Sequence, residues 1–204
     1  DMLRHAGADN ISYVETMVYF QPGAIASLAD KLRQKYPDSS YYTGTDHYSE
    51  MLDFLQRSGL PDAVSAARSD IAAYGDNAKN VLGCGGPEQD RACHVSYALI
   101  AAINRNSGIK GDPGTPDLPK IFTQTAFSFL LSSADKNVVG VNLVGAEDSP
   151  VSLHTFKTVM QFFNFFNSRF KDVNIALHAG ELTPCFIGAG NPAFKEHLTG
   201  SLRA

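Results

Sequence analysis

A histidine and a glutamate stand three residues apart in the stretch "VNIALHAGELTP", which runs from position 173 to position 184. Neutral imidazole is a metal ligand, and a nearby carboxylate can move protons for a metal-activated water. Gly180 between them lets the backbone turn sharply and come close to a substrate. His178, Gly180 and Glu181 are therefore chemically competent for metal-assisted hydrolysis.

A purely structural role is the alternative for these side chains. His178 can be a hydrogen-bonded core histidine and Glu181 a helix-cap acid, because short motifs often occur by chance. The other histidines have no partner at metal-ligand spacing: His5, His47, His94, His154 and His197. Cys84, Cys93 and His94 do not form a recognised zinc pattern.

Two other chemistries are disfavoured. The stretch "GCGGP" at 83–87 is glycine-rich, but no Lys–Ser/Thr pair follows it as a phosphate-binding loop requires. A serine hydrolase of the common α/β type would carry a G-x-S-x-G turn, and the chain has none. We therefore interpret 83–87 as a surface turn.

The elements that position these residues follow from hydrophobic patterning. We predict strands at 11–18, 94–104, 137–147 and 173–178, and a brief extended piece at 80–83. The runs at 94–104 and 137–147 are continuously apolar, as in strands buried on both faces. Helices are predicted at 24–36, 48–58, 61–74, 120–132 and 152–170, with a polar connection at 111–118. The phenylalanine-rich stripe of the last helix is interpreted as core.

Strands that alternate with helices indicate a parallel sheet, because parallel neighbours need a long crossover. A doubly wound sheet and a (β/α) barrel both satisfy this pattern. Both place their sites at the carboxyl ends of the strands, where Glu147 and His178 stand in the sequence. The pattern alone does not separate the two folds.

Several motifs together resemble one family. "HAGE" at 178–181, about one βα unit after "VVGVNLVGAE", is similar to the signature of adenosine deaminases, which are zinc-dependent amidohydrolases. "YVETMV" at 13–18 and "ALIAAINR" at 98–105 resemble earlier strands of that family. The resemblance implies an α/β fold of the (β/α)8 TIM-barrel type. Residues 1–204 would form a single partial barrel domain covering about strands 2 to 5. "LVGAEDSPVSLH" at 143–154 looks closer to the secreted, growth-factor-like branch.

The resemblance also implies roles for individual residues. His178 would bind Zn²⁺, Glu181 would protonate the purine N1 and relay protons, and Gly145 would offer its backbone to N3. Gly180 and Glu147 would border the substrate, a purine nucleoside. The reaction would be hydrolysis of adenosine to inosine and ammonia, and Glu181 would have to be buried for its part. Asn142 and Ala146 depart from the family pattern, which affects base and ribose recognition.

The remaining zinc residues of the family have no counterpart in the chain: a His–x–His pair, a later histidine and an aspartate. We therefore expect an incomplete barrel that is inactive alone and binds zinc weakly. Two alternatives stay open: a non-catalytic nucleoside-binding or growth-factor-like relative, and a deaminase of another aminopurine such as AMP or adenine.

Charge and composition limit the partners. A net charge of −4 disfavours nucleic acid, and the basic cluster at 31–35 is most simply a solvated helix face. No apolar run approaches the roughly 20 residues that span a bilayer, so we expect no membrane segment. Exposed strand edges would favour a homo-oligomer. Cys84 and Cys93 can be bridged, which favours an exported protein, or free, so the compartment stays open.

Overall fold

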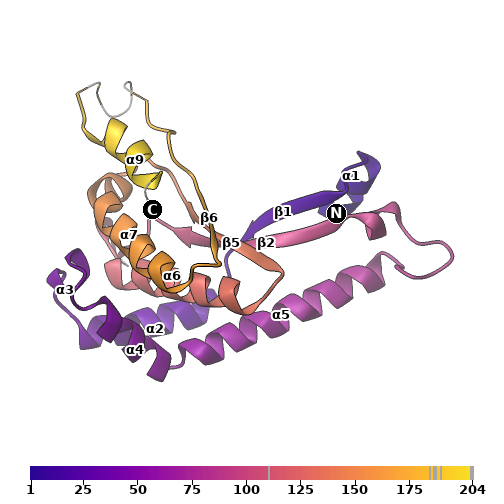
Figure 1. The fold of residues 1–204 in the computed structure, drawn as a ribbon, viewed down its shortest axis with the longest axis horizontal. Helices are drawn as coiled ribbons and strands as arrows, with labels where there is room; N and C mark the ends of the chain where they lie inside the picture. Colours follow the sequence, from indigo (N-terminus) through magenta and orange to yellow (C-terminus); the bar gives the residue numbers. More distant parts are fainter. Residues whose placement is uncertain (110, 184, 186–187, 189, 203–204) are drawn as a thin grey trace.

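A parallel sheet of four strands forms the centre of the molecule (Figure 1). The computed structural model describes residues 1–109, 111–183, 185, 188 and 190–202. The strands follow one another across the sheet in chain order: β1 (Tyr13–Val18), β2 (Ser96–Asn104), β5 (Val138–Val144) and β6 (Asn174–Leu177). All three neighbouring pairs are parallel. The predicted α/β class and parallel pairing are confirmed.

Helices connect the strands and pack against one face of the sheet (Figure 1). Helix α6 contacts both β2 and β5, and α2, α5 and α7 pack around it. The helical segments, including one 3₁₀ turn, are α1 (Met2–Ala8), α2 (Pro22–Lys35), α3 (Ser40–Thr43), α4 (Tyr48–Arg57), α5 (Leu60–Val81), η1 (Arg91–His94), α6 (Leu118–Ala134), α7 (Pro150–Arg169) and α9 (Ala193–Ser201).

The hydrophobic core lies between the sheet and these helices. Leu99, Ala101 and Ile103 of β2 point into it, as do Val141 and Leu143 of β5. The phenylalanine-rich stripe of α7 is part of the same core, as predicted: Phe156, Phe163 and Phe166 are buried. Burying apolar area in this layer is the main stabilising contribution.

The opposite face of the sheet is open in the described residues. Side chains alternate along a strand, so the neighbours of the packed residues point the other way. Tyr13 and Met17 on this side of β1 keep 49% and 47% of their surface exposed. Small side chains such as Ala98 and Ala102 follow on β2. Helices therefore cover only one face of the sheet in the described residues; on the other face Ala98, Ala102 and Asn142 are buried, whereas Tyr13 and Met17 are exposed.

Caps fix the starts of the two helices that follow β2 and β5. The Asp117 carboxylate accepts the backbone N–H of Lys120 at the start of α6 and also pairs with Arg33 of α2 at 2.8 Å. The Ser149 hydroxyl accepts the backbone N–H of Ser152 at the start of α7. Such caps satisfy the free N–H groups of a first helical turn.

Three details of the sequence-based prediction are wrong. The extended piece at 80–83 begins as the last turn of α5, because Ala78 and Lys79 are good helix formers and carry the helix past Gly75. The connection at 111–118 contains a strand, β4 (Asp112–Pro116), which pairs antiparallel with β3 (Gly108–Ile109). The first half of β2 is not continuously buried: Ser96 is exposed, and Tyr97, Leu99 and Ile100 are half-buried.

A disulfide links Cys84 and Cys93, the pairing that the sequence left open. It joins the turn after α5 to η1, just before β2, and the Arg4–Asp90 ion pair lies at the same end of the molecule. In parallel strands this is the amino end of the sheet, opposite to His178. Among the described residues, no helix combines the length and apolarity needed to cross a membrane.

Candidate functional site

His178 follows directly on β6 and lies beside a buried amide of the neighbouring strand. Its Nδ1 lies 3.1 Å from Oδ1 of Asn142, and the amide nitrogen of Asn142 lies 3.1 Å from the Met17 sulfur. Because an amide oxygen only accepts, Nδ1 of the neutral ring carries the proton. Nε2 is then the acceptor, the state in which imidazole binds a metal.

Glu147 lies after β5 and is almost fully buried, with 2% of its surface exposed. Its Oε2 accepts the backbone N–H of Glu181 at 2.7 Å, and its Oε1 accepts that of Gly180 at 3.4 Å. Both carboxylate oxygens are therefore engaged by the segment that follows His178. The carboxylate points at backbone groups of the chain itself, and the contact of Glu147 with a substrate stays a prediction.

Arg105 extends from the end of β2 and is also buried, at 2% exposure. Its Nη2 donates to the carbonyl oxygens of Leu143 and His178. Burial lowers the pKa of this guanidinium, and the negative charges of Glu147 and Glu181 oppose that shift. Within the described residues its Nε has no hydrogen-bond partner. A buried cation thus lies where the carboxyl ends of β2, β5 and β6 meet.

His197 on α9 completes the surroundings of Glu147. Its Nδ1 lies 3.1 Å from Glu147 Oε1, and its ring stacks on Phe156 of α7 with ring centres 3.9 Å apart. Burial lowers the pKa of His197, against the opposing effect of the Glu147 carboxylate. A neutral ring donates from Nδ1 and still satisfies the buried carboxylate.

The Glu181 side chain is exposed, so the expectation that it is buried is wrong for the described chain. Gly180 before it has φ +87, a conformation that favours glycine. The segment 178–183 belongs to no helix or strand. The turn at Gly180 thus brings two backbone N–H groups to Glu147 and leaves the Glu181 carboxylate facing outward.

Gly145 ends β5 at the same edge of the sheet. It has φ +105, and an added Cβ would lie 2.9 Å from Asn106 Nδ2 and 3.0 Å from Asn104 Oδ1. Asn106 also donates to the Ala146 carbonyl oxygen. Gly145 is therefore required by its surroundings, and its exposed backbone remains open to a ligand.

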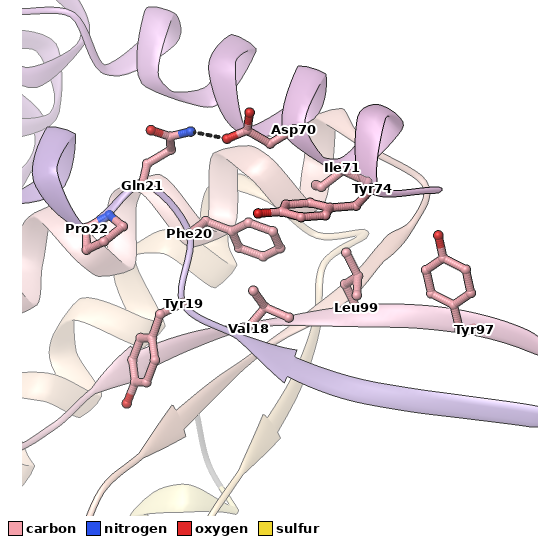
Figure 2. Close-up of a pocket in the computed structure, with 10 residues that line it drawn as sticks. All are labelled: Val18, Tyr19, Phe20, Gln21, Pro22, Asp70, Ile71, Tyr74, Tyr97 and Leu99. Atoms are coloured by element: carbon pink, nitrogen blue, oxygen red, sulfur yellow. Dashed lines mark hydrogen bonds between the residues drawn. The ribbon is translucent and has the colours of Figure 1, made fainter. Parts of the chain in front are cut away.

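A separate groove of about 500 Å³ lies between α5 and the loop after β1 (Figure 2). Phe20 and Tyr74 face each other across it, and Gln21 is bonded to Asp70 at 2.6 Å at its rim. His178 and Glu181 do not line this groove. The groove is therefore distinct from the strand-end residues.

The structure brings together the residues that the sequence singled out. His178, Gly180, Glu181, Gly145 and Glu147 all follow the carboxyl ends of β5 and β6. The sequence does not predict three neighbours: Arg105, Asn142 as the partner of His178, and His197, for which it shows no partner at metal-ligand spacing. Asn142 lies in the motif "VVGVNLVGAE" and Arg105 in "ALIAAINR". Residue spacing does not show which groups their side chains contact.

Among the described residues, no group of three or more His, Cys, Asp or Glu side chains is arranged to hold a metal ion. His178 therefore fits a metal as a single ligand through Nε2. Comparison of the chain with protein-family models, with curated proteins and with solved structures finds no match. The chemistry of the residues that follow β5 and β6 therefore has to be inferred from their geometry.

Proposed function

We propose that this chain is the central part of a zinc-dependent deaminase that hydrolyses adenosine to inosine and ammonia. The observation that carries the proposal is the pairing of His178 with Asn142, which presents Nε2 as an acceptor at a strand end. Glu181 follows within the same turn, with its carboxylate exposed. The resemblance to adenosine deaminases supplies the roles of both residues, although the burial of Glu181 that it also implies is not found in the described residues.

The winding of the sheet supports the barrel half of the proposal. A doubly wound sheet reverses its strand order at a switch point and carries helices on both faces. Here the order β1-β2-β5-β6 never reverses, and the core is packed on one face. In a (β/α)8 barrel the other face would line the interior, where Tyr13 and Met17, exposed here, would be covered.

Zinc, when bound, would activate a water molecule for attack on C6 of the purine. His178 would be one ligand, and further ligands would have to come from residues outside this chain. Glu181 would hold and transfer a proton at N1, and the Gly145 backbone would contact N3. The chain by itself is expected to bind zinc weakly and to be inactive.

The experiment uses a longer protein that contains this chain together with the missing ligands. We expect about one zinc per molecule and the ultraviolet change that accompanies conversion of adenosine to inosine. Glu181→Gln should reduce kcat by 10²- to 10⁴-fold, roughly the usual contribution of a general acid–base residue. Glu88→Gln, another exposed carboxylate, is the control.

The alternatives give different results. A non-catalytic nucleoside-binding or growth-factor-like relative would bind adenosine without an ultraviolet change. A deaminase of AMP or adenine would turn over that compound faster than adenosine. Normal turnover in Glu181→Gln would remove Glu181 from the reaction and contradict the proposed mechanism.

A further inference from the structure

Two buried side chains of opposite charge hold the segment 178–181 from below. Arg105, at the end of β2, donates to the carbonyl oxygen of His178. Glu147, after β5, accepts the backbone N–H groups of Gly180 and Glu181. The backbone of the segment is thus gripped at three points by residues 33 to 73 positions away in sequence.

The segment has no other regular support among the described residues. Residues 178–183 lie outside every helix and strand, so ladder hydrogen bonds do not fix them. Side-chain bonds to such a segment decide its position. Hydrogen bonds to ionised groups are roughly twice as strong as neutral ones.

The charged groups of Arg105 and Glu147 are both buried and do not lie on the surface. Arg105 and Glu147 are each 2% exposed, and burying an ion is costly unless it is paired and hydrogen-bonded. Each therefore depends on the groups around it: Glu147 on the two N–H groups and His197, Arg105 on two carbonyl oxygens. Removing the Arg105 or the Glu147 side chain would free the backbone of 178–181 on that side and would leave the other charge buried.

We propose that Arg105 and Glu147 act as a clamp, a pair of positioning residues that sets the backbone of 178–181 and thereby the places of His178 and Glu181. Both Glu147 oxygens accept protein donors, so Glu147 acts through the segment and not on a substrate. The catalytic consequence rests on the proposed function, but the clamp itself is a property of this chain.

The clamp is tested in the 204-residue chain by amide hydrogen exchange, measured by NMR. Glu147→Gln keeps the shape of the side chain but replaces one acceptor oxygen by an NH₂ donor. We expect the Glu181 amide to exchange at least about tenfold faster, as loss of a bond to a charged group implies. Exchange at Val141 within β5 should stay unchanged. Asp148→Asn, which alters the exposed neighbouring carboxylate, should leave the Glu181 amide protected.

A second variant tests the other half of the clamp and guards against a folding defect in the first. Arg105→Lys keeps the buried positive charge but loses the planar guanidinium whose Nη2 donates to both carbonyl oxygens. The carbonyl carbon resonance of His178 should shift, and the amides of Gly180 and Glu181 should exchange faster. Unchanged exchange at Glu181 in both variants, with the fold intact, would overturn the clamp.

A kinetic measurement separates this inference from the proposed function. In the longer protein, Glu147→Gln should lower kcat and kcat/KM together by about 10- to 100-fold, with KM unchanged, since positioning acts on the reaction and not on binding. A rise in KM with normal kcat would overturn the positioning role. Faster exchange in a protein that never deaminates adenosine would support the clamp and overturn only the proposed function.

Discussion

At the scale of single residues, the orientation of His178 depends on Asn142. In the sequence, Asn142 departs from the pattern of adenosine deaminases at a position expected to affect base recognition. In the structure, its Oδ1 lies 3.1 Å from His178 Nδ1. Groups that bond the far nitrogen of a ligating histidine fix its tautomer and ring orientation. Asn142 therefore belongs with the proposed metal ligand.

Removing that amide should change the tautomer of His178. We expect ¹⁵N NMR of the wild-type ring to show the proton on Nδ1, and Asn142→Ala to show a mixture of both tautomers. Asn142→Asp, which keeps an acceptor at the same place, should retain the proton on Nδ1. His154, whose side chain is exposed, is the internal control and should give the same spectrum in all three proteins. A wild-type ring already mixed between tautomers would contradict the assignment.

The sequence predicted which residues gather at the strand ends but not what they contact. Polar residues that follow parallel strands must meet at one edge, and this placed His178 and Glu147 together. The bond from His197 to Glu147 spans 50 positions and depends on how α9 folds back over α7. No local pattern encodes such a contact, so the sequence shows only that His197 has no partner at metal-ligand spacing.

At the scale of elements, the turn that ends β5 depends on Gly145. A side chain there would need a left-handed backbone and would meet Asn106 and Asn104. Gly145→Ala should therefore destabilise the fold by about 1–3 kcal/mol, the usual cost of one strained backbone position. Urea unfolding measures this cost. Gly44→Ala is the matched control because its φ is −129 and its added methyl meets nothing within 4 Å. Equal midpoints for the two variants would disprove the requirement.

Element types were predicted better than element ends. Long periodic segments such as α7 were recognised because their apolar stripe has one dominant period. The end of α5 and the hairpin of β3 and β4 were missed. In α5 a single glycine was outweighed by the helix formers around it. The strand β4 carries two prolines, at 113 and 116, which are rare in strands and hid its pairing.

At the scale of the whole molecule, the disulfide between Cys84 and Cys93 should contribute to stability. Bridging residues nine positions apart restricts the unfolded chain, and a loop of this size corresponds to about 2–3 kcal/mol. The double variant Cys84→Ser and Cys93→Ser should lose that amount in urea unfolding. Cys185→Ser, at an exposed free cysteine, should be neutral. A thiol count above one on unreduced protein would contradict the bridge.

The open sheet face and the two edge strands should make the 204-residue chain self-associate. β1 and β6 end the sheet in the described residues, and unpaired strand edges invite pairing with another chain. Met17→Lys places a charge on the open face and should weaken association by at least about tenfold, measured by analytical ultracentrifugation. Tyr74→Lys is the control. Tyr74 is more exposed than Met17 and borders the groove on α5, on the helix-covered side of the sheet, so this variant should leave association unchanged. A chain that stays monomeric at every concentration would show that this face needs no cover, and it would weaken the proposal of an incomplete barrel.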